Sequence, residues 1–191
     1  KDTPAFIANR IGVFAMASIY KKASEMGMPI STVDKLTGPS LARPNTGTFR
    51  LGDLVGHDTA AKVMQGIKAN CPNDERSELY QILPFYQFLL DNKFLGNKSG
   101  QGFYKKTNEK DDAGKPIILE LNLQTFEYES QKKLKLTSLE LSKQIEDDKN
   151  RIRTLFDQND DGGKLIRDSL VDLWAYAANR IPEISDNIYN I

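Results

Sequence analysis

The segment from Phe6 to Glu25 constrains the fold most, because apolar residues recur along it at helical spacing on two faces. The first face carries Ile7, Ile11, Phe14 and Ala15, and the second carries Val13, Met16, Ile19 and Tyr20. A helix that is apolar on two sides is buried on two sides. We therefore expect a long helix that packs against two surfaces. One of these surfaces is expected to be another subunit or a second helical unit of this chain.

Helical patterns continue to about residue 106. Further helices are expected over residues 31–36, 49–54 and 58–69, and one more begins at Pro84. Ser31 or Thr32 is placed to cap the first of these, and Asp58 is placed to cap the third. A loop is expected over residues 37–47, and a glycine-rich turn over residues 96–102 leads into an extended segment.

The pattern changes beyond residue 106. Residues 117–123 alternate as in a strand and residues 125–128 form its return, which predicts a small β-hairpin near residues 115–130. Thr137 and Glu140 resemble a capping box that opens a helix. A later helix face carries Ile166, Leu170, Leu173, Trp174 and Ala177, and Pro182 ends it. The expected fold class is mainly α, with a helical unit (1–106), a hairpin and connector (107–136), and an incomplete second helical unit (137–191).

Composition excludes several classes of function. Lys and Arg number 26, as do Asp and Glu, so the chain has no net charge and lacks the cationic excess of a nucleic-acid-binding protein. The apolar run from Ile11 to Tyr20 is too short to span a membrane, and no signal peptide is present. Cys71 is the only cysteine, which indicates a cytoplasmic protein without disulfides.

Four segments, in order, carry a resemblance to a known family. They are residues 1–10, residues 33–39, the Asp-x-x-Gly-x-Asp-Thr step at residues 53–59, and the turn at residues 94–104. Together they resemble the C-terminal domain of the 3-hydroxyacyl-CoA dehydrogenases. Two positions depart from the family pattern: Ala5 stands where Gly is usual, and His57 where Leu is usual.

The resemblance implies both a fold and an activity. The fold would be the helical domain of the 6-phosphogluconate dehydrogenase C-terminal type. The activity would be NAD-dependent oxidation of a 3-hydroxyacyl-CoA, and Asn9 matches the family's active-site Asn. The family's catalytic His–Glu pair and its NAD-binding loop belong to a Rossmann domain that this sequence does not contain. The chain alone is therefore expected to be inactive, to share its acyl-CoA substrate with that domain, and to form a homo-oligomer.

The part from residue 115 onward resembles a region of longer bacterial members of the family. In those proteins a hairpin leads to a second copy of the C-terminal domain, sometimes followed by an enoyl-CoA hydratase domain. The chain begins at Lys1 without an initiator Met and ends at Ile191 in what reads as the middle of an element. We therefore expect a piece of a longer protein.

Asn9, Asn179 and residues 157–168 each have a structural interpretation beside the functional one. Asn9 by itself would more often be a capping residue, and only its place in the matched segment favours catalysis. Asn179 lies in an echo of the Asn9 segment, Ala-Asn-Arg-Ile, but it falls near the end of a helix, so we reject a second catalytic Asn. Residues 157–168 open like a calcium loop, yet Asp168 is a short closing ligand and Lys164 replaces an apolar residue, so an acidic interhelical loop is favoured.

The remaining candidates have weak support. His57 is the only histidine, so it is expected to be structural or exposed, and Cys71 is expected to be unreactive. The turn over residues 96–102 lacks the spacing of a phosphate loop. Four cations are candidates for contacts with CoA phosphates, although solvated surface charge explains them equally well: Lys35, Arg43, Arg50 and Lys98. The alternative function for the whole chain is a non-catalytic helical interaction module.

Overall fold

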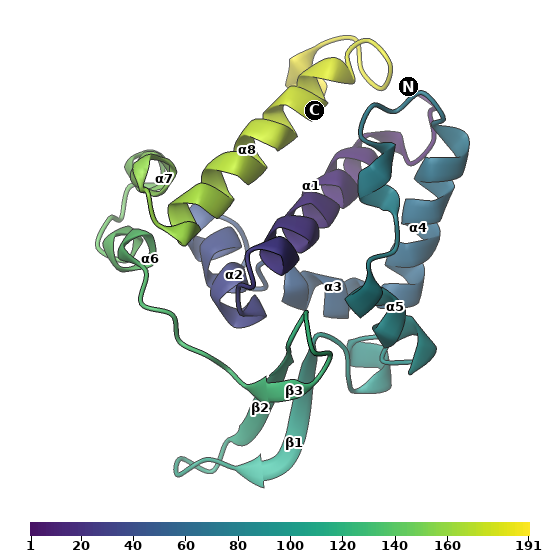
Figure 1. Ribbon diagram of the computed structural model, residues 1–191. Coiled ribbons are helices and arrows are strands. Elements are labelled where there is room, and N and C mark those ends of the chain that lie inside the picture. The colour runs from purple at the N-terminus through teal and green to yellow at the C-terminus, as the bar shows by residue number, and fades with distance from the viewer.

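The computed structural model describes residues 1–191 and is mainly helical, with one small sheet (Figure 1). The helices are α1 (Phe6–Glu25), α2 (Ile30–Thr37), α3 (Phe49–Val55), α4 (His57–Asn70), α5 (Pro84–Asp91), α6 (Thr137–Ser142), α7 (Asp148–Asp157) and α8 (Asp161–Asn179). The strands are β1 (Tyr104–Lys110), β2 (Pro116–Leu121) and β3 (Tyr128–Ser130). None of the helices is both long and apolar enough to cross a membrane.

Helix α1 lies at the centre of the molecule, and α8 runs along it (Figure 1). Ile19 and Tyr20 enter the larger core, which also receives side chains from α2, α4, α5 and α8. Phe14 and Ala17 form a smaller cluster with Leu79 and with a side chain of α8. The prediction that α1 packs on two sides is therefore confirmed, and one of the two surfaces is the second helical unit of the same chain.

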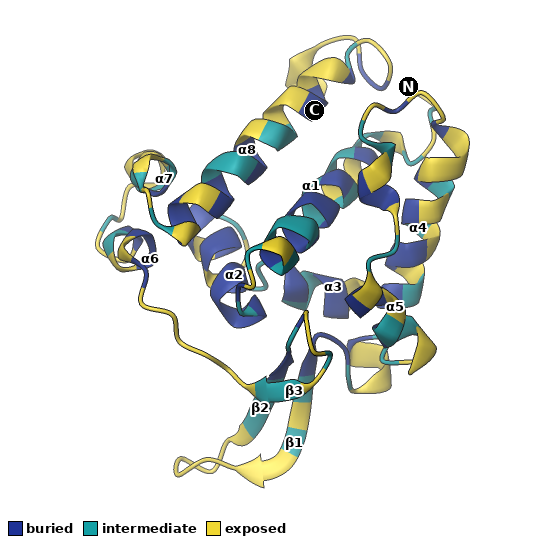
Figure 2. Cartoon of the chain, viewed as in Figure 1, coloured by how far each residue is buried: buried dark blue, intermediate teal, exposed yellow.

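The sheet contains the predicted hairpin, although its return strand lies at Tyr128–Ser130 rather than at residues 125–128, and one further strand. Strands β2 and β3 are antiparallel, with Leu121 opposite Tyr128, and β1 pairs with β2, with Tyr104 opposite Glu120. The inner end of the sheet meets the helices, whereas the distal ends of β1 and β2 are exposed (Figure 2). From β3 a connector leads to α6 and α7, which pack beside the start of α8 (Figure 1).

The expected caps are wrong for three helices, although the helices themselves are present. Ser31 and Thr32 lie inside α2, Asp58 lies in the first turn of α4, and Thr137 lies inside α6. None of these three helices has a side-chain cap from its own N-cap residue. Helices α2 and α6 instead each donate a backbone N–H from their first turn to a carboxylate that is distant in the sequence. The Ser31 N–H donates to Glu120 at 2.7 Å, and the Ser138 N–H donates to Asp160 at 2.8 Å.

Candidate functional site

Asn9 lies in the first turn of α1 and is exposed. The helix begins there without a capping side chain. The two residues at its start, Ala5 and Phe6, have φ angles of 66° and 51°. A left-handed backbone costs a non-glycine residue on the order of 1–3 kcal/mol, so the surrounding structure must hold this turn in place.

Arg10 provides such a hold, because its guanidinium is fully buried and meets four side chains. Its Nε donates to the hydroxyl of Tyr176 at 2.6 Å, and its Nη2 donates to Asp74 at 2.9 Å. Its Nη1 donates to the sulfur of Cys71 at 2.7 Å and lies 3.1 Å from Glu183. Burial alone would lower the pKa of Arg10, but the hydroxyl of Tyr176 and the carboxylate of Glu183 raise this pKa overall.

Tyr176 is the part of this cluster that α8 contributes. Its hydroxyl donates to Asp74 at 2.7 Å and lies 2.8 Å from the hydroxyl of Tyr80. Its ring stacks on Phe14 with the centroids 3.8 Å apart and the planes parallel within 1°. Beyond it, the side chain of Arg180 lies over the ring, 4.8 Å from the centroid. We call Arg10, Cys71, Asp74, Tyr80, Tyr176 and Glu183 the Arg10 cluster.

A groove of about 530 Å³ runs along α1, beginning at Ile11, two residues after Asn9. It lies between α1, α3, the loop over residues 43–48 and one residue of α8. Apolar side chains dominate its walls: Ile11, Ala15, Met16, Ile19, Leu51, Leu54 and Leu173. A Cβ added at Gly12 would meet no atom within 4 Å, so the groove is open at that point.

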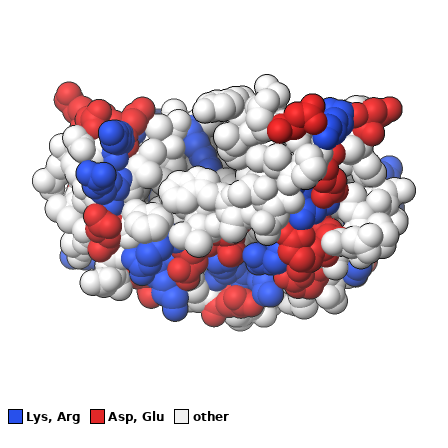
Figure 3. Space-filling model, turned by 90° about the horizontal axis from the view of Figure 1, so that it is seen from above, with Lys and Arg blue, Asp and Glu red and all other residues white.

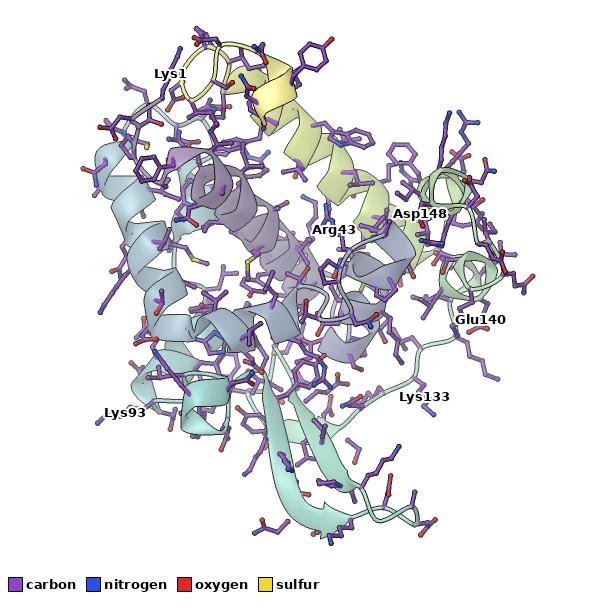
Figure 4. The ribbon with its side chains drawn as sticks, turned by 180° about the vertical axis from the view of Figure 1, so that it is seen from behind. Lys1, Arg43, Lys93, Lys133, Glu140 and Asp148 are labelled. Atoms are coloured by element: carbon purple, nitrogen blue, oxygen red, sulfur yellow. The ribbon has the colours of Figure 1, made fainter.

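Arg43 is the cation of this groove. Seen from behind, it lies between α1 and α2 (Figure 4). Burial lowers the pKa of its guanidinium.

The exposed charged residues of the molecule are dispersed over its surface. In the view from above, uncharged residues fill the middle of the molecule, and Lys, Arg, Asp and Glu mix along its edges (Figure 3).

The four cations considered for phosphate contacts do not converge. Lys35 and Arg50 line a second pocket that shares no lining residue with the groove, and Arg50 also lies over the ring of Tyr104, 4.1 Å from its centroid. Lys98 is paired with Asp58. The structure therefore brings together no cluster of these side chains beside Asn9.

His57 is buried, and it holds the glycine-rich turn in place together with Asp53. The Nε2 of His57 lies 2.8 Å from Asp53, whose carboxylate accepts the N–H groups of Phe103 and Tyr104 at 2.7 and 3.0 Å. A Cβ at Gly102 would come within 2.1 Å of that carboxylate. His57 is thus a structural residue, and through Asp53 it joins the segment at residues 53–59 to the end of the turn at residues 94–104.

The remaining candidates lie apart from Asn9. Asn179 is exposed near the end of α8 and donates to Glu75 at 3.3 Å. The predicted loop over residues 157–168 is helical from Asp161 onward, and the carboxylate of Asp160 caps α8 by accepting the Gly163 N–H at 2.9 Å. No group of three or more His, Cys, Asp or Glu side chains is arranged to hold a metal ion.

Comparisons with known proteins agree with the resemblance seen in the sequence. The family model described as the C-terminal domain of 3-hydroxyacyl-CoA dehydrogenase matches residues 6–106. A probable 3-hydroxyacyl-CoA dehydrogenase of Bacillus subtilis is 35% identical over the whole chain, which covers 23% of that protein. A putative fatty acid oxidation complex trifunctional enzyme of Rickettsia felis is 29% identical over the whole chain, which covers 25% of it.

A mitochondrial hydroxyacyl-coenzyme A dehydrogenase of Rattus norvegicus is similar over a shorter stretch. It is 34% identical over 108 residues, which make up 55% of this chain and 32% of that protein. The chain thus spans about a quarter of the length of the two relatives that it matches throughout. No solved structure matches it significantly.

Proposed function

Because the chain belongs to the family of 3-hydroxyacyl-CoA dehydrogenase C-terminal domains, we propose that it forms the substrate side of such an enzyme. The reaction would be the NAD-dependent oxidation of a 3-hydroxyacyl-CoA to a 3-oxoacyl-CoA in fatty-acid β-oxidation. The observation that carries the proposal is the place of Asn9. Asn9 is exposed on the first turn of α1, three residues before Gly12, which lines the apolar groove.

Asn9 would act on the substrate oxygen. A carboxamide donates a hydrogen bond without changing its own protonation state. It can therefore bind an oxygen more tightly as negative charge develops on it, which lowers the barrier rather than only favouring binding. Asn9 would be the catalytic residue of this chain, and the proton acceptor would belong to another domain.

The groove would receive the apolar part of the acyl-CoA. Ile11, Met16 and Leu51 offer only carbon and sulfur atoms, which suits an acyl chain and excludes a strongly hydrated ligand. Arg43 is the charged side chain that lines the groove, so it would contact a polar group of the substrate there. The proposal concerns the kind of substrate. The length of the acyl chain that the site accepts would depend also on the domain that closes the site.

The residues of this chain do not fit NAD. A dinucleotide site needs a parallel strand, a glycine-rich turn and a helix in that order. Here the sheet is antiparallel, and the turn over residues 96–102 leads from α5 to β1. We therefore assign NAD, which would accept the hydride, to a Rossmann domain elsewhere in a longer protein.

Three further parts of the proposal concern the whole protein. The chain would consist of one C-terminal domain (1–106), a sheet-bearing connector (107–136) and part of a second, similar unit (137–191). The longer protein would be a cytoplasmic homo-oligomer. The exposed side chains of Leu54 and Val55 at the end of α3 support an oligomer contact, and light scattering on the longer protein would measure its mass.

The experiment compares this chain with the longer protein in the NADH-dependent reduction of acetoacetyl-CoA. We expect turnover from the longer protein and none from the chain alone, because hydride transfer needs the nicotinamide held against the substrate carbon. A longer protein that binds NADH yet reduces no 3-oxoacyl-CoA would contradict the proposal. That result would favour the alternative function, a non-catalytic helical interaction module.

A further inference from the structure

We infer that Tyr176 and the end of α8 position Asn9 through Arg10, so that the second helical unit is a working part of the substrate site. This inference rests on the proposed function. It gives residues 161–183 a role that neither the family match over residues 6–106 nor the proposed chemistry of Asn9 assigns to them.

The first step is the contact between the two units. Arg10 follows Asn9 directly on α1, and its side chain is drawn into the molecule by partners from two other segments. Cys71 and Asp74 come from the segment after α4, whereas Tyr176 and Glu183 come from α8 and the residues beyond it. Without α8 and the residues beyond it, the Arg10 guanidinium would lose two of its four partners, and a buried charge that loses its partners is strongly unfavourable.

The second step is the weakness of the helix start itself. The first turn of α1 has no side-chain cap and no acidic residue to oppose the helix dipole. Ala5 and Phe6 enter it through a left-handed backbone. Local sequence thus does little to fix this turn, and the buried contacts of Arg10 are the side-chain interactions that hold it against the rest of the molecule.

The third step concerns geometry. A hydrogen bond to a developing charge depends steeply on the placement of its donor, and a shift of about 1 Å can lower a rate on the order of a hundredfold. Tyr176 joins Arg10 to Asp74 through one hydroxyl, and its ring stacks on Phe14 one turn further along α1. Tyr176 is therefore a positioning residue that reaches the substrate only through Asn9.

The test uses Tyr176→Phe in the longer protein, because this change removes the hydroxyl and keeps the stacked ring. We expect kcat for acetoacetyl-CoA reduction to fall on the order of ten- to a hundredfold while KM stays nearly constant. Tyr189→Phe is the matched control, since the Tyr189 side chain is 94% exposed, and it should leave kcat unchanged. Glu183→Gln, at the exposed edge of the cluster, should lower kcat less and serves as the second variant should Tyr176→Phe not fold.

A double-mutant cycle separates positioning from a merely structural role. In an Asn9→Ala background, Tyr176→Phe should lower kcat no further, because the group that it positions is already gone. Equal effects of Tyr176→Phe with and without Asn9 would overturn the inference. So would unchanged kcat in a folded Tyr176→Phe, or in Glu183→Gln should that variant carry the test. If Asn9→Ala alone leaves kcat unchanged, the proposed function of Asn9 fails instead, and the inference that depends on it fails with it.

Discussion

Ala5 shows how one residue can store strain at a site. Its φ of 66° is left-handed, and such a conformation costs an L-residue about 1–2 kcal/mol that glycine does not incur. Ala5→Gly should therefore raise the free energy of unfolding, by up to about 1 kcal/mol after the greater flexibility of unfolded glycine is counted. Urea denaturation of both proteins would measure the difference.

Ala8→Gly is the matched control for Ala5→Gly. Ala8 lies in the same first turns of α1, is exposed, and has no left-handed backbone. The same substitution should there lower the free energy of unfolding by about 0.5–1 kcal/mol. Equal destabilisation by both changes would show that the backbone at Ala5 carries no strain.

At the residue scale, the sequence predicts Asn9 and leaves Arg10 unnoticed. Asn9 is found only because it lies within a matched segment, since an Asn near a helix start is otherwise a common cap. Arg10 carries no such signal, because a charged residue on a helix is normally exposed. The partners that bury it lie between 61 residues (Cys71) and 173 residues (Glu183) away in the chain. No local pattern connects residues at such separations.

At the scale of elements, distant carboxylates satisfy the starts of several helices. Asp34 of α2 accepts the N–H groups of Phe49 and Arg50 at the start of α3, at 2.6 and 3.1 Å, and also the hydroxyl of Tyr104. Asp34 is buried, and burial raises its pKa to about 6, although these hydrogen bonds act to lower it.

The pKa of Asp34 predicts a dependence of stability on pH. A carboxyl with a higher pKa in the folded state binds its proton more tightly there, so its stabilising contribution is full below the unfolded pKa near 4. That contribution is lost as the pH rises to about 6. The free energy of unfolding would thereby fall by at most about 3 kcal/mol.

Asp34→Asn isolates this contribution. The free energy of unfolding of the wild type, relative to the variant, should fall between about pH 4 and pH 6, which urea titrations at several pH values would show. A difference that stays flat, or rises, across this range would mean that Asp34 is ionised throughout in the folded protein.

The loop over residues 157–168 is the second prediction at this scale. Calcium needs oxygen ligands at alternating positions of a loop, but here the residues from Asp161 onward are helical and Asp160 caps them. Calorimetry should detect no micromolar calcium binding. Such binding, if observed and then abolished by Asp157→Ala, would show that the helix start rearranges around the ion.

The helices with strong apolar periodicity were predictable, whereas helix α7 was not, and strand β1 was expected only as an extended segment after the glycine-rich turn. Helix α1 has the predicted bounds because both of its faces are apolar over twenty residues. Strand β1 has mostly exposed side chains, so it lacks alternation and forms by backbone pairing with β2. Helix α7 is short and largely polar, and it is held by Leu155 in the core and by a cap from Asp147.

At the scale of the whole molecule, the two helical units pack as one body. The larger core takes side chains from α1 to α5, from the sheet and from α6 to α8. A second unit that shares the core of the first cannot open independently without exposing apolar surface.

The most direct measurement is steady-state reduction of acetoacetyl-CoA by Asn9→Ala in the longer protein, with Asn179→Ala as the matched control. Loss of one hydrogen-bond donor to a developing charge typically lowers turnover on the order of a hundredfold or more. We expect that fall for Asn9→Ala with KM changed far less, and nearly unchanged kinetics for folded Asn179→Ala. Turnover near the wild-type value in Asn9→Ala would contradict the assignment of the site, and a fall confined to Asn179→Ala would place the site at the C-terminal end of α8.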